Sequence, residues 1–184
     1  MRKFRFPLLL LVVLALSTVA FIGPKPPQQN KGQAAALTYG QYWKKVDSLT
    51  KKGLSKSALD VVMDVYQKAK TENDQEQLVK AIIHRMKFQS MTEEDETKKI
   101  INDLTKDCSQ IKFPANAILH SMLAETYWSY YQQNRYRFLD RTQTVNFQND
   151  DINTWDARKI FEETLKHYKL SLANASQLQK VQVN

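Results

Sequence analysis

Apolar residues recur every three or four positions along most of the chain from residue 39 onward, which is the spacing of one face of an α-helix. Turn and capping residues separate the periodic segments. The pattern predicts helices over residues 39–52, 56–70, 75–89, about 92–108, 114–133 and 155–173. One stripe has six members on a single face: Ala58, Leu59, Val62, Val65, Tyr66 and Ala69.

Local signals suggest where these helices begin and end. Gly53 is suited to end the first helix, and Ser55 to cap the second. Thr92 is followed by three acids, so we expect it to cap the fourth helix. Residues 136–145 lack a helical period and predict an extended excursion. In the last helix we expect these residues to face inward: Ile160, Phe161, Leu165, Tyr168 and Leu172.

Helices of about 15 residues joined by short turns are typical of helical-hairpin repeats. We therefore predict an all-α fold of antiparallel helical hairpins, packed as a TPR-like repeat array over residues 38–173. The chain contains no tetratricopeptide consensus, so the repeat is degenerate. Residues 174–184 have only weak periodicity and are interpreted as a tail, the start of a continuation.

The first residues are of a different kind. A basic start (Arg2, Lys3, Arg5) precedes an apolar run and the small residues around Ala20, which is the composition of a secretory signal peptide over residues 1–20. The apolar run reaches Ile22, so an uncleaved membrane anchor is the alternative. Residues 23–37 are rich in Pro and polar residues and predict a flexible linker. We expect an exported protein of the periplasm or cell surface.

The net charge of +8 does not indicate nucleic-acid binding. Removal of the three bases before Ala20 leaves +5, and the remaining bases alternate with acids as on a solvated helix face. A nucleic-acid site would show clustered bases with little acid.

Candidate catalytic and metal-binding residues do not form recognisable motifs. The histidines, His84, His120 and His167, fall on three predicted helices without metal-ligand spacing. Cys108 shares a face with apolar neighbours, which predicts a buried thiol. The acids Asp150, Asp151 and Asp156 fit helix caps better than a calcium loop. We therefore expect no enzyme activity, no catalytic residue, no cofactor and no metal.

Aromatic and Arg residues gather in the longest helix and just beyond it. Such residues pack cores, and they are also favoured at protein interfaces. The interface interpretation predicts a protein-docking surface made of Trp128, Tyr131, Arg135, Tyr136, Arg137 and Arg141.

Two longer segments resemble a known family. Residues 42–58 (YWKKVDSLTKKGLSKSA) and 117–142 (AILHSMLAETYWSYYQQNRYRFLDRT), together with DDINTWD at 150–156, are similar to the N-terminal helical region of Bacteroidetes alpha-2-macroglobulin-like proteins. The likeness covers about residues 40–172. It implies that this chain is the truncated start of a much larger extracellular endopeptidase inhibitor. Because the bait region and thioester of that family are missing here, the resemblance identifies no functional residue.

These observations favour a non-catalytic exported interaction module, the N-terminal part of an alpha-2-macroglobulin-like inhibitor. Its partners would be other domains of the same large chain, proteases or envelope proteins. One alternative is a stand-alone TPR-like scaffold for envelope proteins. Another is an exported helical hydrolase, which would need one of the three histidines beside a carboxylate.

Overall fold

The computed structural model describes residues 37–92, 95–139 and 151–181, which belong to one structural unit. Every regular element within these ranges is helical. The predicted signal segment and almost all of the predicted linker lie outside the described residues. In chain order the elements are α1 (Tyr39–Lys51), α2 (Ser55–Glu72), α3 (Gln75–Thr92), α4 (Glu96–Gln110), α5 (Ala115–Leu139), the 3₁₀ turn η2 (Ile152–Thr154), α6 (Ala157–Leu172) and α7 (Ala175–Leu178).

Several of the predicted turn and capping residues have the expected role. Gly53 has a φ of 72° just after α1, a left-handed conformation that glycine adopts without a steric penalty. Asp156 accepts a hydrogen bond from the backbone N–H of Lys159 at 2.8 Å and so caps α6. Asp151 caps η2 in the same way, through the N–H of Asn153 at 3.1 Å. The interpretation of these two acids as caps is confirmed, while Asp150 lies outside the described residues.

Three predicted boundaries are wrong. Thr92 ends α3 instead of capping the next helix, because its hydroxyl donates back to the carbonyl of Phe88 at 2.8 Å. Ser55 begins α2, but its side chain makes no capping bond. Residues 136–139 of the predicted excursion are helical, because α5 continues to Leu139, and residues 140–145 lie outside the described residues. The aromatic side chain of Phe138 is 7% exposed and anchors this last turn.

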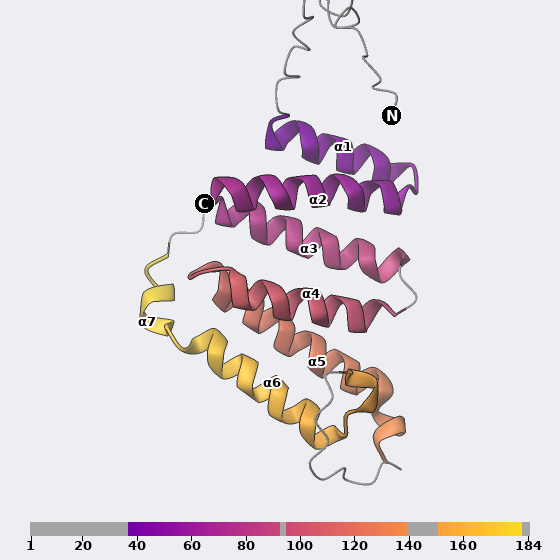
Figure 1. Ribbon diagram of the computed structural model, residues 1–184, viewed down its shortest axis with the longest axis vertical. Coiled ribbons are helices and arrows are strands. Elements are labelled where there is room, and N and C mark those ends of the chain that lie inside the picture. The colour runs from indigo at the N-terminus through magenta and orange to yellow at the C-terminus, as the bar shows by residue number, and fades with distance from the viewer. Residues whose placement is uncertain (1–36, 93–94, 140–150, 182–184) are drawn as a thin grey trace, which may run out of the picture. The chain divides into compact units, whose positions relative to one another are not determined.

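Successive helices contact one another from α1 to α6, and α3 also contacts α5. Figure 1 shows α3 and α5 lying behind α2, α4 and α6. The core between these helices is apolar and continuous. Its largest fully buried apolar side chains are Phe88, Ile82, Leu104, Leu119, Leu123, Ile152 and Ile160. In the part of the chain that the structure describes, no helix has the length and hydrophobicity needed to cross a membrane.

Helix α6 packs with a different face from the one its apolar residues predict. Its buried residues are Ile160, Thr164, His167 and Ser171. Of the predicted inward set only Ile160 is buried, whereas Leu165 and Leu172 are 59% and 67% exposed. The small Thr and Ser side chains allow a close approach to α5, and His167 finds a polar partner there. The more hydrophobic side of α6 therefore faces outward.

Candidate functional site

An aromatic cluster joins α5 to α6. Trp128 stacks on Tyr131 with ring centroids 5.6 Å apart, and both rings contact Phe161, at 6.1 and 4.6 Å. Tyr131 also contacts Phe138 at 5.7 Å. These spacings are those of favourable aromatic pairs. The cluster is only partly covered, since Trp128 and Phe161 are 37% and 36% exposed.

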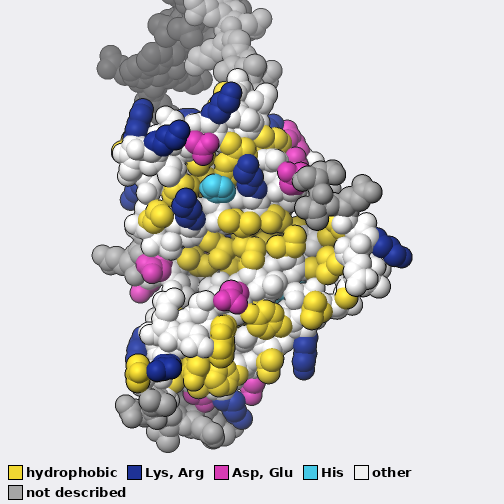
Figure 2. Space-filling view, turned by 180° about the vertical axis from the view of Figure 1, so that it is seen from behind, with side chains coloured by type: hydrophobic (Ala, Val, Ile, Leu, Met, Phe, Trp, Pro, Cys, Tyr) yellow, Lys and Arg dark blue, Asp and Glu magenta, His cyan; other side chains and the backbone are white. Residues whose placement is uncertain are grey.

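Further apolar side chains continue this cluster along α6. The next turns of that helix expose Leu165 and Leu172. Figure 2, a view from behind, shows hydrophobic side chains as a broad band across the middle of the domain and in smaller groups below it. We define the α5–α6 surface by its five exposed or half-exposed members: Trp128, Tyr131, Phe161, Leu165 and Leu172.

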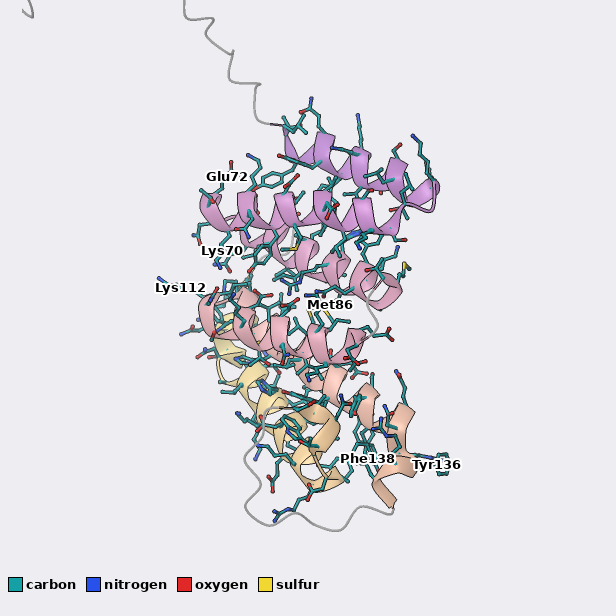
Figure 3. The ribbon with its side chains drawn as sticks, turned by 45° about the vertical axis from the view of Figure 1, so that its right-hand side comes forward. Lys70, Glu72, Met86, Lys112, Tyr136 and Phe138 are labelled. Carbon is teal, nitrogen blue, oxygen red and sulfur yellow. The ribbon has the colours of Figure 1, made fainter. Side chains whose placement is uncertain are left out.

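The predicted docking residues divide into two groups. Trp128 and Tyr131 belong to the α5–α6 surface. Arg135 and Tyr136 form a separate pair, because the guanidinium lies 4.9 Å from the ring centroid and donates to the phenol oxygen at 3.0 Å. Tyr136 is 69% exposed and points away from α5, as Figure 3 shows.

The other two predicted docking residues have different outcomes. Arg137 donates to the amide oxygen of Asn134 at 3.2 Å, within one turn of α5. Arg141 lies outside the described residues. Sequence reasoning missed Phe161 and Leu165 as surface residues, because their spacing is equally that of a core stripe.

A buried ionic network lies between α2, α3 and α4. Arg85 donates to one carboxylate oxygen of Asp107 at 2.5 Å, and the Tyr66 hydroxyl donates to the other at 2.6 Å. Arg85 and Asp107 are 4% and 2% exposed. Burial, and then the Asp107 carboxylate, raise the pKa of Tyr66 to about 12, so its phenol stays protonated and remains a donor. Nothing in the sequence spacing of these three residues indicated the network.

Two histidines that are 47 residues apart in sequence meet between α5 and α6. The Nδ1 atoms of His120 and His167 lie 2.9 Å apart, which is hydrogen-bond distance if one ring carries its proton on Nδ1. Glu163 lies 3.7 Å from the Nε2 atom of His167. Burial, and then the neighbouring His120 and Lys166, lower the pKa of His167 to about 4. Burial also lowers the pKa of His120, so both rings are neutral at pH 7.

This neutral pair predicts a loss of stability in mild acid. Because the pKa of His167 is lower in the folded chain than in the unfolded chain, the unfolded state binds more protons below about pH 6.5. The unfolding free energy is therefore not reduced by His167 above about pH 6.5, and it falls as the pH drops toward 4. We expect a loss of about 2 kcal/mol between pH 7 and 5 from this residue alone.

Urea unfolding at pH 7, 6 and 5, followed by circular dichroism, would measure this loss. In the variant His167→Gln, the unfolding free energy should fall less steeply with decreasing pH over the same range. The exposed Lys169→Gln serves as the control and should keep the slope of the original chain. If the unfolding free energy of His167→Gln and of the original chain depended equally on pH, His167 would not be the cause of the loss in acid.

Two candidate side chains remain, Cys108 on α4 and His84 on α3. Cys108 is half-buried against the core, and burial raises the pKa of its thiol to about 12, which disfavours the nucleophilic thiolate. His84 packs on Trp43 with ring centroids 4.8 Å apart, on a different helix pair from the other histidines. Among the residues that the structure describes, no three His, Cys, Asp or Glu side chains are arranged to hold a metal ion.

Three arrangements stand out among the described residues. They are a partly exposed aromatic cluster, a buried ionic network and a neutral histidine pair. Comparisons of the chain with protein-family models, with curated proteins and with solved structures find no match.

Proposed function

We propose that residues 38–173 form a TPR-like array of three antiparallel hairpins, α1–α2, α3–α4 and α5–α6, and that this array is a non-catalytic protein-interaction module. The order of the contacts supports the array, since each helix packs on the next and α5 packs on both helices of the preceding hairpin. Repeats of this kind cover their apolar faces by stacking neighbours.

The observation that carries the proposal is the α5–α6 surface. Large apolar side chains at the turns of α6 are exposed where a stacked repeat would be covered, with Leu165 at 59% and Leu172 at 67%. Trp128 and Phe161 add an aromatic anchor of the type that dominates protein interfaces. Contiguous exposed apolar groups of this kind mark interaction sites.

We propose that the occupant of this surface is an amphipathic helical hairpin. This choice follows from the way that each hairpin packs on the one before it. α5 covers the α3–α4 hairpin with an apolar stripe that includes Leu119 and Leu123, both fully buried. A further hairpin with a similar stripe would cover Leu165 and Leu172 in the same manner.

Site-specific photo-crosslinking tests this docking. The full chain carries p-benzoylphenylalanine in place of Leu165, and a control carries it at Asp64, an exposed position on α2. We expect ultraviolet light to attach position 165 to peptides with a helical apolar period, and the Asp64 control to give no such adduct. Phe161→Glu should abolish the adduct and Lys169→Glu should preserve it. Adducts only with lipid or with a second copy of this chain would contradict the proposal.

The identity of the crosslinked polypeptide distinguishes the two functions inferred from the sequence. The resemblance to alpha-2-macroglobulin-like proteins predicts that the hairpin belongs to the same, larger polypeptide, an exported endopeptidase inhibitor. The alternative, a stand-alone envelope scaffold, predicts adducts with a separate envelope protein. Export itself stays a prediction from the composition of residues 1–20.

A further inference from the structure

A second surface lies on α2, α3 and α4, away from the α5–α6 surface. The side chains of these three helices line a groove of about 480 Å³, here called the α2–α4 groove. Tyr66, Arg85 and Asp107 form part of its lining, so the buried ionic network lies beneath it. Leu59 and Met63 on α2 supply an apolar part of the wall.

Two buried polar atoms in the lining have no hydrogen-bond partner. They are Nε of Arg85 and Oε1 of Gln89, and both side chains are at least 96% buried, at 4% and 2% exposure. A buried polar group without a partner costs roughly 1–3 kcal/mol. One of these atoms is a donor and the other an acceptor, which is the complement of a peptide group. Neither atom is exposed to solvent, so a bound peptide would reach them only after rotation of the Gln89 amide or a local shift of the Arg85 side chain.

The rim of the groove adds positive charge. Lys70, Lys99 and Lys106 all line it and are exposed. Lys70 contacts only neutral groups, the Gln110 amide and the Tyr66 ring. Among the ion pairs of the described residues, none involves any of these three lysines.

Of the acids in the lining, Asp107 is neutralised by Arg85, and Asp103 accepts from the Gln89 amide at 2.6 Å. Asp60 is the third acid, on the α2 side.

The spacing along α4 suggests the form of the ligand. Lys99 and Lys106 are seven residues apart on one helix, which corresponds to about 10.5 Å at 1.5 Å per residue. In an extended polyproline-type peptide, side chains recur on one side every three residues, about 9.3 Å apart. Two acidic side chains three residues apart would therefore meet both lysines, whose long side chains absorb the difference.

We propose that the α2–α4 groove binds an extended acidic peptide with two carboxylates three residues apart. Lys99 and Lys106 contact the carboxylates, and the peptide backbone between them lies above the groove floor that Arg85 and Gln89 help to form. This binding site is additional to the helical docking proposed for the α5–α6 surface. A failed peptide selection would therefore contradict only the α2–α4 groove proposal, and a failed crosslink at position 165 would contradict only the helical docking on the α5–α6 surface.

A random dodecapeptide display library selected on the full chain tests the proposal. We expect the selected peptides to be enriched in pairs of Asp or Glu residues three apart. The double variant Lys99→Glu with Lys106→Glu should weaken their binding at least tenfold, measured by fluorescence anisotropy of the labelled peptides. Both positions are exposed, so circular dichroism should show an unchanged helical fold.

A matched control is available on α1. Lys44 and Lys51 are also exposed and seven residues apart, so Lys44→Glu with Lys51→Glu makes the same change of charge at the same spacing. This control should bind the peptides like the original chain. The proposal is overturned by selected peptides without acidic pairs, by equal binding to the Lys99 and Lys106 variant, or by complete displacement with millimolar sulfate, which would indicate a simple anion site.

Discussion

The variant Asp107→Ala should lose about 3–5 kcal/mol of unfolding free energy, because it leaves the guanidinium of Arg85 buried without its counter-charge. The Tyr66 hydroxyl loses its acceptor in the same step. Because small domains are stable by only about 5–15 kcal/mol, such a loss is a large fraction of the total. Urea unfolding followed by circular dichroism at 222 nm measures it.

Two further variants separate a lost charge pair from general damage. Asp64→Ala removes an exposed carboxylate on α2 and should change stability by less than about 0.5 kcal/mol. The apolar replacement Arg85→Met with Asp107→Leu should recover most of the loss, because it removes the unpaired charge as well as the pair. A loss below about 1 kcal/mol for Asp107→Ala would show that Arg85 reaches solvent.

Truncation at the neighbouring positions 118 and 119 on α5 should lower the stability by very different amounts. Leu119 is 0% exposed, so Leu119→Ala removes buried methyl groups and leaves a cavity, with an expected cost of about 2–5 kcal/mol. Ile118 is 46% exposed, so Ile118→Ala should cost less than about 1 kcal/mol. Thermal and urea unfolding of the two variants give the comparison.

This pair is informative because the helical spacing of α5 assigns both residues to its apolar side. A larger loss at Ile118 than at Leu119 would show that another face of α5 packs on α4 and α6.

The sequence by itself determined the helices, because the signals that specify them are local. The apolar period of α2 predicted its buried stripe except that Leu59 is only half-buried and Val61 is buried instead. Gly53 and Asp156 specified the end of α1 and the cap of α6 through bonds within a few residues. Thr92 could cap a following helix or end the preceding one. Its hydroxyl bonds to the preceding turn, so Thr92 is the last residue of α3.

The tertiary structure alone decided which side chains meet and which apolar face is covered. Arg85 and Asp107 are 22 residues apart and His120 and His167 are 47 apart, and no period links either pair. The stripe of α6 could be assigned to a core or to an interface, because hydrophobic spacing specifies a face and does not specify its neighbour. Packing placed Thr164 and His167 against α5 and left Leu165 exposed, which created the proposed docking surface.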